Sequence, residues 1–170
     1  MISSDYIFAK GDNNDTTMKF TVDYNKNIPD IRLVYEKEDY SIETLPVINS
    51  SDFTIEINYL NLSVINRQVH QIWGCFPVSK DMQCNLQIPP HKKGVLKVID
   101  ELEKGFTYVI THDNKFSVFV DFAKKCLCVG KLFSDDTRIS VEFMTNCIIS
   151  LNKYNEFEAL WLMPEDVPIL

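Results

Sequence analysis

Residues 106–162 read FTYVITHDNKFSVFVDFAKKCLCVGKLFSDDTRISVEFMTNCIISLNKYNEFEALWL, and this stretch decides the fold. Short runs rich in Val, Ile, Phe and Cys alternate in it with short polar turns, a pattern typical of β-strands. We expect strands at residues 106–110, 117–121, 126–130, 139–143, 147–151 and 157–162. Because sequential strands with short turns pair with their neighbours, this stretch predicts an antiparallel meander.

Upstream of this stretch, the clearest strand lies at residues 52–58. Phe53, Ile55 and Ile57 alternate there with polar residues, which indicates a half-buried strand. The alternation changes phase near Tyr59 and predicts a bend or bulge. Further strands are expected at 31–35, 69–73 and 82–88, and residues 5–9 and 18–22 are expected to form a hairpin around the polar loop 11–16.

Residues 94–104 fit two structures equally well. Their apolar residues match one face of a helix, with Gly105 in place to end it, whereas three β-branched residues favour a strand. The choice between helix and strand therefore stays open. The whole chain is expected to be one mainly β domain, residues 1–170, forming a curved sheet or sandwich. An α+β variant with at most one or two short helices is possible within this interpretation.

The charge is distributed unevenly along the chain. The net charge of −7 arises from an acidic segment at each end and a basic middle. Residues 1–50 are expected to form an acidic segment packed on the β-meander of residues 53–164. The acidic residues expected to contact a partner are Glu36, Glu38, Asp39, Glu43, Asp52 and Glu56. With only three arginines in the chain and no basic–aromatic motif, nucleic acid is not an expected partner.

The sequence offers little for catalysis or metal binding. Cys126 and Cys128 lie on one face of a strand, but no second close pair completes a zinc site. Cys75 with His70 or His91 would be a nucleophile pair without any local signature. No cofactor, metal or catalytic residue is therefore predicted. The five cysteines are expected to be reduced thiols, and no signal peptide or membrane span is apparent, which favours the cytoplasm.

Four short motifs carry a resemblance to a known group of proteins. They are Gln71-Ile-Trp-Gly-Cys-Phe-Pro77, Cys128-Val-Gly130, Val141-Glu-Phe143 and Ala159-Leu-Trp-Leu-Met-Pro164. In this order they resemble small β-rich bacterial immunity proteins of polymorphic and contact-dependent growth inhibition toxin systems, over residues 55–164. These are packing motifs and carry no catalytic residues.

The resemblance implies a non-enzymatic, cytoplasmic immunity protein that binds one cognate toxin domain. Such toxins are often basic nucleases, and acidic segments would complement them. Two alternatives remain: a ligand-binding β-module with an apolar pocket between sheets, and an enzyme that uses a cysteine or histidine. The sequence does not define the oligomeric state.

Overall fold

The computed structural model describes residues 6–8, 18–110, 115–133 and 135–165, with side chains from residue 18 onward. These residues form a mainly β domain, which confirms the fold class expected from the sequence. The elements are β1 (Tyr6–Phe8), β2 (Phe20–Asp23), β3 (Arg32–Glu36), β4 (Ser41–Leu45), β5 (Phe53–Ile57), β6 (Leu60–Ile65), β7 (Gln68–Cys75), the 3-10 turn η2 (Lys80–Met82), β8 (Lys92–Lys93), β9 (Val95–Val98), β10 (Thr107–Val109), β11 (Val118–Asp121), β12 (Cys126–Gly130), β13 (Ile139–Met144), β14 (Cys147–Leu151) and β15 (Phe157–Leu162).

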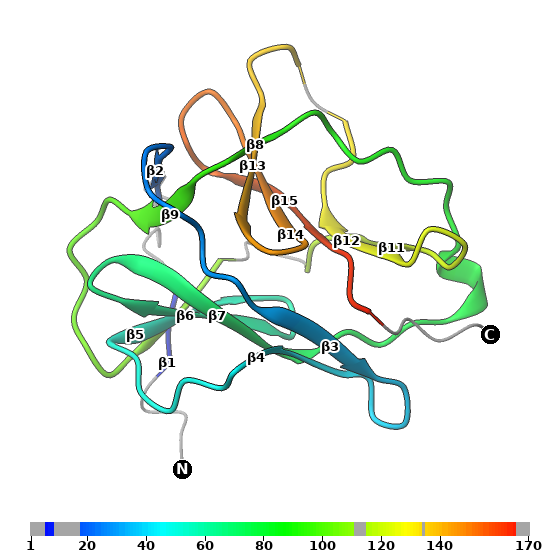
Figure 1. Cartoon of the computed structure of the whole chain (residues 1–170), viewed down its shortest axis with the longest axis horizontal. Coiled ribbons are helices and arrows are strands. Elements are labelled where there is room, and N and C mark those ends of the chain that lie inside the picture. Colours follow the sequence, from blue (N-terminus) through cyan, green and yellow to red (C-terminus); the bar gives the residue numbers. More distant parts are fainter. Residues whose placement is uncertain (1–5, 9–17, 111–114, 134, 166–170) are drawn as a thin grey trace.

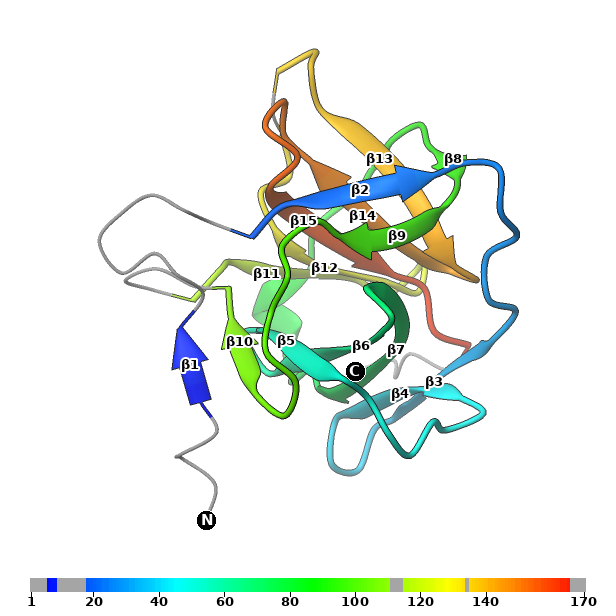
Figure 2. The same ribbon diagram turned by 90° about the vertical axis from the view of Figure 1, so that its left-hand side faces the viewer.

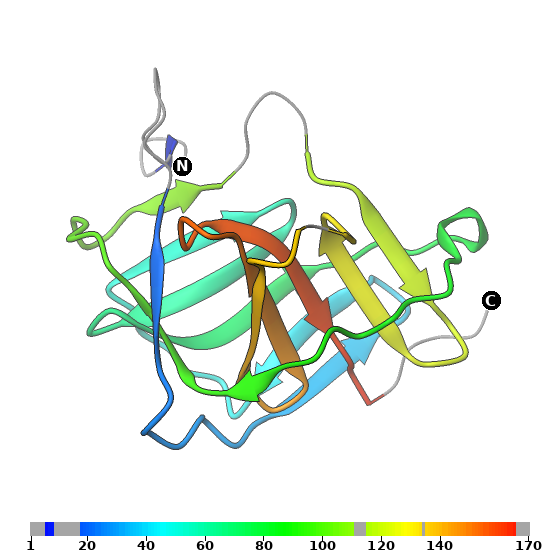
Figure 3. The same cartoon turned by 90° about the horizontal axis from the view of Figure 1, so that it is seen from above.

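The strands form two sheets that pack face to face (Figure 1). The first sheet has the order β1-β10-β5-β6-β7-β4-β3, with the β2–β9 pair attached to β7. The second has the order β11-β12-β15-β14-β13-β8. In it β13, β14 and β15 follow one another as antiparallel neighbours, and β12 joins them beside β15. Seen from above, strands of the second sheet cross over those of the first (Figure 3).

The β2–β9 pair joins the two sheets along one side (Figure 2). It connects to the first sheet where Gln68 pairs with Lys97. It connects to the second sheet through hydrogen bonds from Phe20 N to Asn155 O (2.9 Å) and from Gly94 N to Glu142 O (3.1 Å).

The expected hairpin between residues 5–9 and 18–22 is wrong, because β1 pairs in parallel with β10 and β2 pairs with β9. The proposed loop 11–16 lies outside the described residues.

The main core lies between the sheets and is formed by alternating side chains from the strands of both. Phe53, Ile55 and Ile57 of β5 point into it, as the sequence predicted, and Leu160 and Leu162 of β15 do so from the opposite sheet. Residues 94–104, left open between helix and strand, contain the strand β9. Tyr59 belongs to a tight turn between β5 and β6, at the place where a bend was expected.

Two glycines allow neighbouring strands to approach closely. Gly74 (φ +138°) faces the carbonyl of Tyr59 in the β5–β6 turn, and Gly130 (φ +122°) faces the carbonyl of Glu158 in β15. A Cβ at either position would stand 2.2 Å from that oxygen. Any other residue would clash there and would also be strained. The Trp-Gly and Cys-x-Gly motifs therefore have a packing explanation.

The outer face of the second sheet is covered. Residues 82–88, expected to be a strand, instead run as an extended segment over this sheet after η2, as the green trace in Figure 1 shows. Leu86 is buried there against Cys126, Cys128, Ile148 and Trp161. Alternation along the segment arises because Leu86 points to the sheet while its neighbours face solvent.

Candidate functional site

The acidic residues of positions 36–43 are gathered on one hairpin. Strands β3 and β4 form it, at the edge of the first sheet, and its loop projects at the lower right of Figure 1. Glu36, Glu38, Asp39 and Glu43 are all exposed. Hydrogen bonds from Ser41 hold the pKa of the Asp39 carboxyl below its usual range, so this residue is charged at neutral pH and also shapes the turn.

The hairpin is fixed to the residue after β7 by one contact from β3 and one from its loop. Its inward residues include Tyr35, whose hydroxyl donates a hydrogen bond to Phe76 O at 2.5 Å. In return, Phe76 N donates to Tyr40 O at 2.9 Å. Burial raises the pKa of Tyr35, so the hydroxyl stays protonated and keeps this bond. The acidic loop is therefore held in a defined position despite its exposure.

An exposed tryptophan lies directly beside the acidic hairpin. Glu43 of β4 is the cross-strand partner of Trp73 of β7, so the two side chains project from the same outer face of the first sheet. The Trp73 side chain is 41% exposed, and its indole N–H donates to Ser63 Oγ at 3.0 Å. This bond fixes the ring orientation while leaving part of the ring in contact with solvent.

Glu56 lies farther along the same row of the sheet. The row runs from Glu43 through Trp73 and Asn61 to Glu56, each residue paired with the next across neighbouring strands. Glu56 is half-buried, and burial raises its pKa while the Lys115 charge opposes the rise. Glu56 is therefore a less exposed acid than those of the hairpin.

Asp52 lies apart from the other five candidates. Its carboxylate accepts a hydrogen bond from Asn66 N at 2.8 Å and lies 3.8 Å from Lys104 Nζ. These contacts hold the Asn66–Arg67 turn between β6 and β7, whose two residues both have positive φ. Asp52 thus has a structural role that the sequence did not reveal, at the opposite end of the sheet from the acidic loop.

Trp73 is not among the partner-binding residues expected from the sequence. Strict alternation from the buried Val69 would place Trp73 in the core. The register shift between β6 and β7 changes this phase, so that Ile72 is buried and Trp73 points outward. Trp161 of β15, by contrast, is 1% exposed and packs in the closed cluster on the second sheet.

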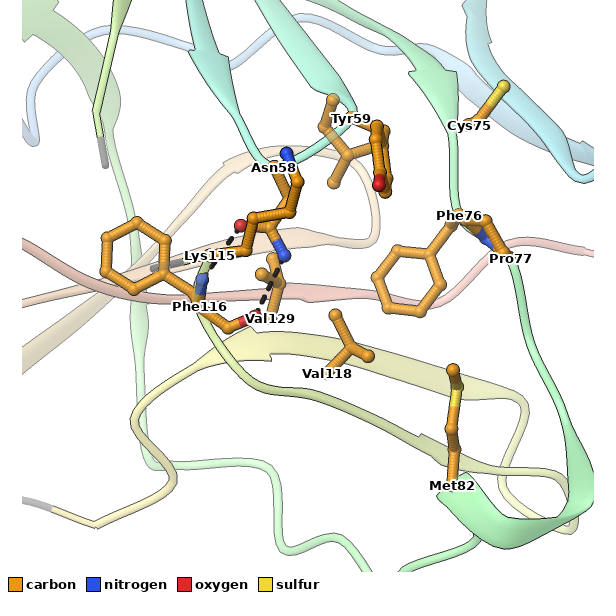
Figure 4. A pocket seen from close by; sticks show the side chains of 11 residues that line it. Asn58, Tyr59, Cys75, Phe76, Pro77, Met82, Lys115, Phe116, Val118 and Val129 are labelled. Carbon is orange, nitrogen blue, oxygen red and sulfur yellow. Dashed lines mark hydrogen bonds between the residues drawn. The ribbon is translucent and has the colours of Figure 1, made fainter. Parts of the chain in front are cut away.

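A second candidate site is a cavity of about 240 Å³ between the two sheets. It lies where the β5–β6 turn and the end of β7 approach η2 and the start of β11 (Figure 4). The ring of Phe76 and the side chains of Met82 and Val118 point toward the same space in Figure 4, whereas the Cys75 sulfur points away from it. Its wall is therefore mostly apolar.

The nucleophile pairs considered from the sequence do not meet in this cavity. Its described lining contains Cys75 but neither a histidine nor a carboxylate. Cys126 and Cys128 are buried under the covering segment of the second sheet. Within the described residues, no group of three His, Cys, Asp or Glu side chains is placed to hold a metal ion. His112 lies outside the described residues.

Comparison with known proteins finds no family model and no curated protein that matches this chain. Among the residues that the structure describes, none belongs to a helix long and apolar enough to cross a membrane.

Proposed function

We propose that this protein is an immunity protein, which binds a cognate toxin domain and neutralises it stoichiometrically through the acidic hairpin and the adjoining outer face of the first sheet. The observation that carries the proposal is the gathering of Glu36, Glu38, Asp39 and Glu43 on one exposed, well-anchored hairpin. A concentrated negative charge of this kind steers a basic partner and accelerates its encounter.

The neighbouring Trp73 side chain would supply binding affinity, to which exposed charges contribute little. Interface affinity is concentrated in a few residues, among which tryptophan is over-represented, while surrounding charges set association rate and selectivity. Trp73 is exposed, held by Ser63, and flanked by Glu43. The hairpin and Trp73 thus combine an aromatic anchor with an acidic rim, as a basic nuclease domain would require.

The resemblance of the four packing motifs to immunity proteins supports the same proposal from a separate direction. Two of those motifs place glycines at close strand contacts, and one of them contains Trp73 itself. The proposal gives the protein no catalytic activity of its own. An enzyme using Cys75 is less favoured, because the Cys75 sulfur points away from the cavity whose wall it helps to form.

The proposal is tested by co-expressing this chain with the toxin domain encoded beside its gene. We expect growth to be rescued and the two proteins to co-purify at a fixed ratio near one to one. Rescue at strongly sub-stoichiometric levels, or without a complex, would instead indicate an enzyme that modifies the toxin or its target, and would overturn the proposal.

A further inference from the structure

The cavity between the sheets has the composition of a ligand site. Its wall includes Leu60 of the first sheet, Val118 and Val129 of the second, and Met82 of the η2 turn. Its volume of about 240 Å³ lies just below the ~300–1,000 Å³ of typical small-molecule pockets. A ligand that fills it has on the order of ten non-hydrogen atoms, since a water-sized group occupies ~30 Å³.

Two of the polar side chains at the cavity, Asn58 and Lys115, differ in their contacts. The Asn58 side chain donates to Phe116 O at 2.9 Å and accepts from Phe116 N at 3.0 Å. It therefore ties the β5–β6 turn to the segment before β11, and the dashed lines in Figure 4 mark these two bonds. Within the described lining, Lys115 is the charged residue.

Lys115 is placed at the rim rather than in the apolar wall. Its Nζ lies 4.3 Å from the centroid of the Tyr59 ring, and both side chains are exposed. In Figure 4 the Lys115 side chain runs up beside Tyr59, on the side of the cavity away from Met82. A cation stacked on an aromatic ring keeps its charge and its hydrogen-bonding capacity for an anion.

We propose that this cavity binds a small amphipathic anion, with an aliphatic or aromatic body among Leu60, Phe76 and Val118 and a carboxylate at Lys115. The apolar wall selects the body of the ligand by burial, and the single ammonium at the rim selects the sign of its headgroup. The apolar body of the cavity lies between the sheets, whereas Lys115 at its rim is close enough to Glu56 for the two charges to interact. The inference does not rest on the immunity function.

The test uses the full chain and three eight-carbon probes: octanoate, 1-octanol and octylamine. Calorimetric titration at neutral pH should show one octanoate per chain with a dissociation constant below about 1 mM, the range open to a ligand of about ten atoms. Octanoate should bind about three- to fivefold more tightly than octanol, as expected for one exposed ion pair. Octylamine should bind most weakly.

Two kinds of variant locate the binding. Lys115→Gln should bring octanoate down to the affinity of octanol, while Lys153→Gln should change nothing. Lys153 is the matched control because its Nζ also lies over a tyrosine ring, that of Tyr154, but outside the cavity. Val118→Phe and, independently, Met82→Phe should fill the cavity and abolish binding of both probes, with folding checked by the melting temperature.

Each contrary outcome overturns a stated part of the inference. Equal affinity for octanoate, octanol and octylamine would remove the anion selectivity. Unchanged octanoate binding in both folded cavity-filling variants would place the probe elsewhere. Absence of binding at millimolar octanoate would show that the cavity is not a site for this class of ligand. None of these results bears on toxin binding, so failure here is distinguishable from failure of the immunity proposal.

Discussion

The outer face of each sheet carries a tryptophan that is hydrogen-bonded to a serine, but one tryptophan is exposed to solvent and the other is buried. Trp73 of the first sheet donates its indole N–H to Ser63 Oγ, and Trp161 of the second donates to Ser150 Oγ, at 3.0 and 3.1 Å. Yet Trp73 is 41% exposed and Trp161 is 1% exposed. The difference arises because residues 82–88 cover the second sheet with Leu86. One tryptophan is committed to stability and the other is available for binding.

Cysteine reactivity should show the largest difference between the faces. Burial raises the pKa of Cys126, on the covered face, from 9.0 to about 12, which lowers its thiolate fraction at neutral pH about a thousandfold. Cys75, on the open face, is exposed. A disulfide reagent should therefore label Cys75 in the native protein and leave Cys126, Cys128 and Cys147 unmodified.

The same titration in denaturant should report five thiols, and Cys75→Ser should remove the fast native reaction. Labelling of Cys126 or Cys128 at the rate of Cys75 would show that the segment over the second sheet does not protect it.

Trp161→Ala should cost about 3–5 kcal/mol in the free energy of unfolding, because it removes a large side chain from a closed cluster. Trp161 lies on β15, between β12 and β14, and its side chain is packed against Leu86 of the covering segment. Urea unfolding measures the change. A loss below about 1 kcal/mol would mean that the covered face is not a core.

Asp121 fastens the covering segment and should matter next most. Burial would raise the pKa of this carboxyl, but hydrogen bonds from Leu86 N (3.0 Å) and Lys124 N (3.1 Å) outweigh it and hold the pKa below its usual range. Asp121→Ala leaves both donors without this acceptor and should cost about 1–3 kcal/mol. Asp135→Ala, which removes a similar but exposed turn contact, is the control and should cost less.

The contribution of Asp121 should also depend on pH. Since its pKa is lower in the folded than in the unfolded chain, the stabilisation is present above the unfolded value of about 3.9 and is lost as pH falls through the folded value. The stability difference between wild type and Asp121→Ala should therefore shrink below about pH 4. A difference that grows on acidification would contradict this assignment.

Trp73→Ala should change stability least, by about 1 kcal/mol or less, because the side chain is partly exposed and loses one hydrogen bond. Urea unfolding beside Trp161→Ala gives the comparison directly. Equal losses for the two variants would mean that both tryptophans are structural.

Local patterns in the sequence predicted most of the strands, and pairing between distant segments accounts for what they missed. The alternation of Phe53, Ile55 and Ile57 is a property of one strand and is visible without a partner. Residues 106–110 were expected to open the meander, whereas β10 pairs in parallel with β5 and β1. Parallel pairing leaves no local turn signal, so the sheet to which β10 belongs could not be read from its residues.

The candidate sites likewise contain features that the local sequence predicted and features that depend on how distant segments pack. The acids of the β3–β4 hairpin were visible as a run in the sequence, although the strand β4 itself was not expected. The exposure of Trp73 and the cavity beside Lys115 depend on how the two sheets meet. Asp52 was grouped with the hairpin acids by charge alone, and its contact with Asn66 explains its place at the opposite end of the sheet.

The central claim is that the acidic hairpin steers a basic toxin domain to the open face. The most direct test is the association rate of that domain with Glu36→Lys/Glu38→Lys/Glu43→Lys, which leaves the turn-forming Asp39 in place. The matched control, Glu101→Lys/Glu103→Lys/Asp136→Lys, changes net charge equally at exposed positions elsewhere. We expect about a tenfold slower association for the hairpin variant at low salt, a smaller loss for the control, and convergence at high salt. Equal rates for both variants, or a wild-type rate independent of salt, would contradict the account.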